Sequence, residues 1–159
     1  MDTIKKRILV VDDELDILET LEELLDNFKV DTASNFEDAL KYLKNNKYDV
    51  AVLDIMGVRG YDLLKVTTKL GTPSLMLTAH ALSPSNLKES IKLGADAYIP
   101  KDKLLDIPLY IEDVLTAKQN KIKAGTDWFA RLAPFFTKFF GKKWQEPEKD
   151  FWDDFNKKA

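Results

Sequence analysis

The feature that most constrains this chain is a short apolar run, Val50 to Leu53, which ends at the carboxylate of Asp54. Four apolar residues without a polar break are typical of a strand buried on both faces, as in a parallel sheet covered by helices. Open α/β sheets place their ligands at the carboxyl ends of the strands. The run therefore predicts a buried parallel strand with Asp54 at its functional end.

The same pattern occurs elsewhere in the chain, and it predicts the fold class. Three other apolar runs end at polar residues: 7–11 at Asp12 and Asp13, 74–77 at Thr78, and 97–99 at Lys101. Apolar residues at spacings of three and four predict the intervening helices: 15–28, 36–43, 61–70, 84–94 and 108–121. With a weak strand at 30–33, the chain predicts an α/β fold, a doubly wound five-stranded parallel sheet.

Charge and aromatic content divide the chain in two. Residues 1–118 have a net charge of −6, whereas residues 119–159 have a net charge of +3 and contain all three tryptophans. Gly125 lies in the region where the composition changes. We therefore expect one domain over residues 1–122 and an aromatic-rich helical C-terminal extension over residues 123–159.

The extension predicts two amphipathic helices. The first has an apolar stripe at helical spacing. Pro134 predicts a kink or a break within this helix, and Gly141 predicts its end. Pro147 fits the first turn of the second helix. So many aromatic side chains would form a large exposed patch unless covered. Three interpretations stay open: packing on this chain or a twin chain, docking of another protein, and interfacial membrane binding.

Composition excludes several kinds of site. The chain has no cysteine and a single histidine, which excludes disulfides and thiol catalysis and argues against a His-based triad or multi-His metal site. No apolar run approaches the length of a membrane span or of a signal peptide's apolar region. We expect a cytoplasmic protein, and the modest charge of the extension predicts no nucleic-acid partner.

The polar residues at the strand ends form a chemically coherent set. Because these ends lie on one edge of a parallel sheet, Asp12, Asp13, Asp54, Thr78 and Lys101 can converge. Clustered carboxylates repel one another unless a cation offsets them, and an all-oxygen site suits Mg²⁺. Asp54 could then act as a nucleophile toward a phosphoryl group, with the hydroxyl and the ammonium binding its oxygens.

These residues also carry a family resemblance. The segments are Val10–Glu14, Leu53–Met56, Leu77–Ala79 and Gly94–Lys101, and in this order and spacing they are highly specific. Over residues 5–122 the chain resembles the receiver domain of two-component response regulators, the CheY-like superfamily. The resemblance implies a flavodoxin-like fold with strand order 2-1-3-4-5.

The resemblance also implies roles for particular residues. Asp54 would accept a phosphoryl group from a phosphohistidine on a sensor histidine kinase or phosphotransfer protein. Mg²⁺ would be bound by Asp13, Asp54 and the backbone carbonyl of Met56, with Asp12 reaching it through water. Thr78 and Tyr98 would form a switch pair: the hydroxyl moves toward the phosphoryl group and the ring turns inward.

The chain departs from the family pattern at a few positions. Val58 stands where the family often has proline, so the loop after Asp54 can differ in shape. Asp102 follows Lys101 in place of the usual proline, and because a cis bond before a non-proline residue is costly, we expect a trans peptide and an altered Lys101 position. Met56 and His80 flank the expected path of attacking water; the thioether cannot orient water, and the lone imidazole leaves the dephosphorylation rate open.

We therefore expect a stand-alone response regulator that switches protein–protein interactions, including self-association, and that is not an enzyme beyond its own Mg²⁺-dependent phosphorylation and autodephosphorylation. The alternative is a receiver-fold interaction module that works without phosphorylation through its C-terminal aromatic helices. A phosphatase of the haloacid dehalogenase type is disfavoured, because it normally has a second aspartate where this chain has Met56.

Overall fold

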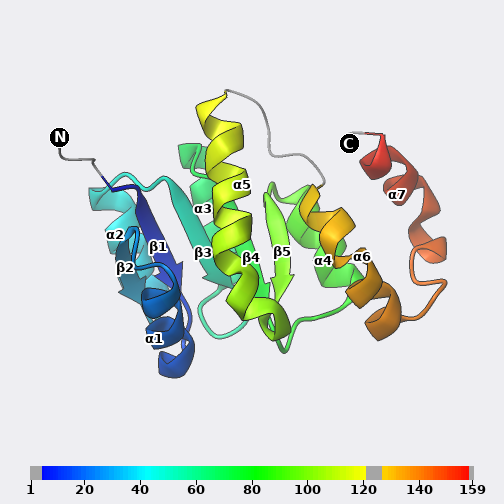
Figure 1. Ribbon diagram of the computed structural model, residues 1–159, viewed down its shortest axis with the longest axis horizontal. Helices are drawn as coiled ribbons and strands as arrows, with labels where there is room; N and C mark the ends of the chain where they lie inside the picture. The colour runs from blue at the N-terminus through cyan, green and yellow to red at the C-terminus, as the bar shows by residue number, and fades with distance from the viewer. Residues whose placement is uncertain (1–4, 121–126, 158–159) are drawn as a thin grey trace.

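In the computed structural model, which describes residues 5–120 and 127–157, five parallel strands form one sheet in the order β2-β1-β3-β4-β5 (Figure 1). The strands have these bounds: β1 Arg7–Val11, β2 Lys29–Ala33, β3 Val50–Asp54, β4 Ser74–Thr78 and β5 Ala97–Pro100. The predicted fold class and strand order are thus confirmed. β3 and β4 are buried along their whole length, as the unbroken apolar runs predicted.

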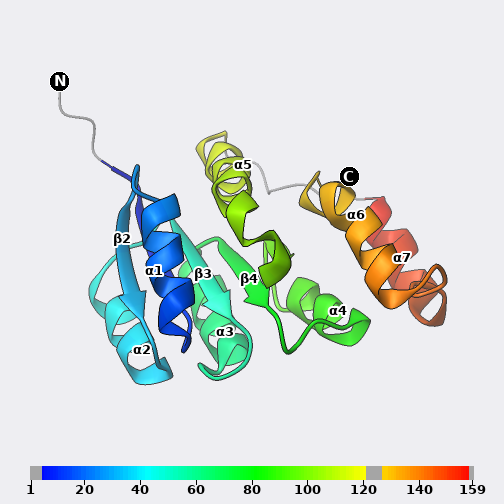
Figure 2. The same ribbon diagram turned by 60° about the horizontal axis from the view of Figure 1, so that its bottom comes forward.

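Helices cover both faces of the sheet. α1 and α5 lie on one face, and α2, α3 and α4 lie on the other (Figures 1 and 2). Their bounds are α1 Leu15–Leu24, α2 Phe36–Asn45, α3 Gly60–Leu70, α4 Pro84–Lys92 and α5 Ile107–Gln119. A short 3₁₀ segment that the sequence did not predict, η1 Lys101–Asp106, joins β5 to α5.

Local sequence signals set several helix ends. The Asn35 side chain accepts a hydrogen bond from the backbone N–H of Asp38 at 2.9 Å, and Ser83 accepts one from Asn86 at 3.1 Å. Pro84 then occupies the first turn of α4, where its missing N–H costs nothing. In α1, Leu18 and Leu21 are buried, whereas Leu15, the first residue of the helix, is 65% exposed.

The C-terminal part forms two helices, α6 Asp127–Phe140 and α7 Lys149–Asn156, with a 3₁₀ turn, η2 Glu146–Glu148, before the second. We call residues 127–157 the C-terminal helical pair. A kink or a break was predicted at Pro134, and the break does not occur, because α6 continues through this residue. The helix ends just before Gly141, which has a φ of 102°. The predicted domain boundary at 122–123 lies outside the described residues.

The helical pair packs on the receiver-like body of the same chain. α6 lies beside β5 and α4, and α7 lies on its far side (Figures 1 and 2). The aromatic stripe is largely internal, with these side chains buried: Trp128, Phe129, Phe136, Trp144, Trp152 and Phe155. Of the interpretations left open for the extension, the structure shows packing on the chain itself.

No helix in the described ranges, 5–120 and 127–157, is long and apolar enough to cross a membrane.

The packing of α3 yields a first prediction. Leu63 is fully buried under the sheet, whereas Leu70, on the same helix, is 57% exposed. Leu63→Ala should lower the free energy of unfolding by about 2–5 kcal/mol, because it removes buried methyl groups and leaves a cavity. Leu70→Ala, the matched control, should change it by less than about 0.5 kcal/mol. Urea unfolding followed by circular dichroism measures both, and equal effects would contradict the assigned orientation of α3.

Candidate functional site

Polar side chains from four strands converge at the carboxyl edge of the sheet. Asp12 and Asp13 follow β1, Asp54 is the last residue of β3, Thr78 is the last of β4, and Lys101 follows β5 directly. The structure therefore brings the predicted residues to one edge, because parallel strands all end there.

Three carboxylates form the acidic part of the site. One oxygen from each of Asp12, Asp13 and Asp54 lies within 4.8 Å of the others. Asp12 is fully buried and Asp54 is 5% exposed, whereas Asp13 is exposed. The group thus has a dry inner side and an open outer side, through which a cation or a phosphoryl donor can approach.

Lys101 bridges the acidic residues. Its Nζ lies 2.9 Å from Asp12 Oδ2, 3.5 Å from Asp54 Oδ1 and 3.2 Å from Glu14 Oε2. Burial alone would lower the pKa of this lysine, but the hydrogen bond and charge of Asp12, with the charge of Asp54, raise it. The ammonium therefore stays charged. The Lys101–Asp102 peptide is trans, as expected, and Lys101 still reaches Asp54.

The inner carboxyl groups have perturbed acidities. Burial, followed by the charge of Asp12, raises the pKa of Asp54 to about 7, although Lys101 opposes this shift. Burial also raises the pKa of Asp12, although the Glu14 N–H donates to its Oδ1 at 2.9 Å. The protein thus concentrates negative charge that one lysine only partly neutralises, and a second cation would relieve it.

Glu14 and Gly57 are site residues that the sequence reasoning missed. Glu14 lies at the start of α1 and accepts from Lys101, and its place directly after the two aspartates was the available signal. Gly57 has a φ of 83°, and a Cβ there would overlap the carboxylate of Asp13. Any other residue would force the Asp13 carboxylate to move from its present position, and its backbone would be strained at this positive φ. The oxygen ligands and this space fit Mg²⁺, which prefers carboxylates and water.

The remaining predicted residues surround this group. Thr78 is buried, and its Oγ1 accepts a hydrogen bond from the Ala81 N–H at 3.0 Å. Tyr98 points inward and is fully buried; its hydroxyl donates to the Ala81 carbonyl at 2.7 Å. Met56 is exposed in the loop after β3, and the exposed imidazole of His80 lies 4.0 Å from Glu14. Their roles in dephosphorylation stay predictions.

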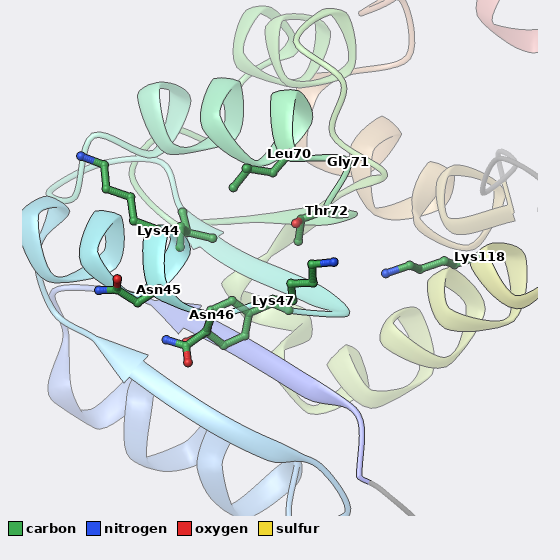
Figure 3. A pocket seen from close by; sticks show the side chains of 10 residues that line it. Lys44, Asn45, Asn46, Lys47, Leu70, Gly71, Thr72 and Lys118 are labelled. Atoms are coloured by element: carbon green, nitrogen blue, oxygen red, sulfur yellow. The ribbon is translucent and has the colours of Figure 1, made fainter.

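A separate hollow lies at the opposite, amino edge of the sheet (Figure 3). Its volume is about 500 Å³, and it is lined by residues 43–48, 70–72 and Lys118. It has lysines at its rim, and its lining lacks carboxylates. None of the polar residues that converge at the carboxyl edge lines this hollow.

The raised pKa of Asp54 predicts how stability depends on pH. Between pH 4 and 7 the folded, metal-free protein retains a proton on Asp54 that the unfolded chain has lost, so stability falls as the pH rises through this range. Asp54→Asn should therefore stabilise the protein at pH 8 by on the order of 2 kcal/mol and have little effect at pH 4. Urea unfolding with EDTA at both pH values measures this. An equal gain from Asp26→Asn, an exposed carboxylate, would contradict it.

Comparison with known proteins agrees with this geometry. Residues 8–107 match the model of the response regulator receiver domain family. The transcriptional regulatory protein DltR of Streptococcus agalactiae is 38% identical over 130 residues, covering 75% of this chain and 58% of DltR. The response regulator MprA of a Mycobacterium species is 36% identical, covering 69% of this chain and 47% of MprA. The chain thus matches about half the length of these curated relatives.

Solved structures agree as well. A CheY-like receiver domain protein of Methanospirillum hungatei superposes with a TM-score of 0.68 at 30% identity, covering 75% of this chain and 99% of that one. A response regulator of Burkholderia pseudomallei, solved with a phosphorylated aspartic acid and a calcium ion, superposes with a TM-score of 0.61 at 25% identity, covering 73% and 72%. With its five-stranded fold and acidic site, this chain belongs to the response regulator receiver domain family of two-component signal transduction.

Proposed function

We propose that this protein is a phosphoacceptor: Asp54 takes a phosphoryl group from a phosphohistidine of a sensor histidine kinase or phosphotransfer protein, in a reaction that needs Mg²⁺. The observation that carries the proposal is the Lys101 ammonium, which lies within 3.5 Å of both Asp12 and Asp54 beside the three-carboxylate group. A lysine that served only in a structural salt bridge would need a single acidic partner. This arrangement gathers more negative charge than one lysine neutralises.

The residues divide the chemistry among them. An oxygen of deprotonated Asp54 attacks phosphorus, the new O–P bond forms as the N–P bond of the donor breaks, and the leaving imidazole gains a proton. In this proposal Lys101 binds one phosphoryl oxygen, and the Thr78 hydroxyl donates to another. Asp13, Asp54 and the Met56 carbonyl would hold Mg²⁺, with Asp12 bound to it through water; the ion would supply charge neutralisation of the transferring group.

The relatives support this proposal. One of the superposed proteins has a phosphorylated aspartic acid and a divalent cation in its structure. The alternative, an interaction module that works without phosphorylation, finds no support in these relatives. It also does not explain why Lys101 and three carboxylates are gathered at one site. A cytoplasmic location, where histidine kinases present their phosphorylated domains, belongs to the same proposal.

Labelling tests the proposal directly. The full chain incubated with acetyl phosphate and Mg²⁺, then reduced with borohydride, should carry its label on Asp54 when mapped by mass spectrometry. Lys101→Met should slow labelling by about 100-fold, because it removes a charge that stabilises the transition state. Lys92→Met, an exposed lysine on α4, is the control. Label on another residue, or none with a competent donor, would overturn the proposal.

The space at Gly57 gives a test of the metal site. Gly57→Ala should abolish the stabilisation by Mg²⁺, because the added Cβ displaces Asp13. Gly71→Ala is the matched control, since Gly71 also has a positive φ, of 74°, but a Cβ there meets nothing within 4 Å. Both variants should lose about 1 kcal/mol of stability through backbone strain, but only Gly71→Ala should still gain melting temperature in MgCl₂ relative to NaCl of equal ionic strength. A normal Mg²⁺ response in Gly57→Ala would contradict this site.

A further inference from the structure

The C-terminal helical pair is connected to the candidate site by a continuous chain of contacts. The ring of Phe136 on α6 lies 6.1 Å from the ring of Tyr98 on β5, centroid to centroid, and both side chains are fully buried. The Tyr98 hydroxyl donates to the Ala81 carbonyl at 2.7 Å, and the Ala81 N–H donates to Thr78 Oγ1 at 3.0 Å. Three contacts thus connect α6 to the hydroxyl of Thr78, to which the proposed function assigns a hydrogen bond to the phosphoryl group.

Further contacts fix the pair on this face. Arg131 of α6 forms an ion pair with Asp113 of α5 at 3.5 Å, and Lys88 of α4 forms one with Glu148 at 2.8 Å. The Lys88 ammonium also lies 5.3 Å from the centre of the Phe151 ring. The docked position is therefore defined by several contacts around the buried pair Phe136 and Tyr98.

The position of Phe136 constrains the position of Tyr98. Phe136 packs against the inward-pointing ring and is itself enclosed by Phe129, Phe140 and Trp144. An outward Tyr98 ring would need the volume that Phe136 occupies, and a close-packed core has no spare volume of that size. Docking of the helical pair therefore selects the inward Tyr98 and, through Ala81, one position of the loop that follows Thr78.

We propose that the C-terminal helical pair is an intramolecular ligand of the receiver, thermodynamically linked to phosphorylation of Asp54 through Phe136, Tyr98, Ala81 and Thr78. This inference rests on the proposed function. A phosphoryl group that hydrogen-bonds to Thr78 fixes the loop to which Tyr98 is bound, and so favours the ring position on which Phe136 docks. Because linkage is reciprocal, docking of the pair strengthens phosphoryl binding by the same factor.

The test uses the full chain and beryllofluoride with Mg²⁺ as the phosphoryl mimic. All three tryptophans lie in the helical pair, so tryptophan fluorescence and hydrogen exchange of residues 127–157 both report on docking. The mimic should slow exchange in α6 by about fivefold or more. Phe136→Ala should weaken beryllofluoride binding, measured by ¹⁹F NMR, by a similar factor. Phe139→Ala, which removes a ring that is 58% exposed on the same helix, should not.

A second variant separates docking from coupling. Tyr98→Phe retains the ring against Phe136 but removes the hydroxyl that contacts Ala81. In the absence of beryllofluoride, hydrogen exchange of α6 in Tyr98→Phe should equal that of the wild-type protein, because the pair stays docked. Addition of beryllofluoride should no longer slow this exchange.

The outcomes are distinct. Unchanged or faster exchange of α6 in a protein whose Asp54 is labelled by acetyl phosphate would overturn the linkage and leave the proposed function intact. Absence of labelling at Asp54 would overturn both. Equal effects of Phe136→Ala and Phe139→Ala on beryllofluoride binding would overturn the route through Tyr98.

Discussion

The functional site depends on the burial of two carboxyl groups, those of Asp12 and Asp54, next to one ammonium group, that of Lys101. Asp12 and Asp54 are almost fully buried, and Lys101 is the cation that contacts both. Burying unbalanced charge is unfavourable, and the raised pKa of each of these carboxyl groups reflects this. Such a site stays in an apolar protein interior only because the surrounding sheet holds it there. This repulsion between the carboxylates fits the proposed binding of a divalent cation at the site.

The parallel sheet explains why these groups meet. β3 and β4 are buried on both faces, and each ends in a polar side chain, Asp54 or Thr78, at the carboxyl edge of the sheet. Register then sets the neighbours: Asp54 is aligned with Leu77, which places Thr78 one residue beyond it on the adjacent strand. Gly57 completes the geometry by leaving space for Asp13. The fold supplies position, and a few residues at one edge supply the chemistry.

The short apolar runs predicted the parallel strands and the polar residues at their carboxyl ends, and the family resemblance implied the strand order. Sequence reasoning missed the role of Glu14, whose contact with Lys101 joins residues 87 positions apart. It expected a kink or a break at Pro134, yet the helix is not broken, because the burial of Leu132 and Phe136 on either side outweighs the lost hydrogen bond. Only tertiary packing could decide these cases.

The position of α6 has a consequence for the outer strands of the sheet. An outer strand presents unpaired backbone groups that can recruit a strand from another molecule. At one margin, β2 alternates charged side chains, Lys29 and Asp31, which discourage such recruitment. At the other margin, β5 is entirely buried and relies on α6 for cover. The helical pair therefore shields this outer strand, and its displacement would expose backbone groups with which a strand of another molecule could pair.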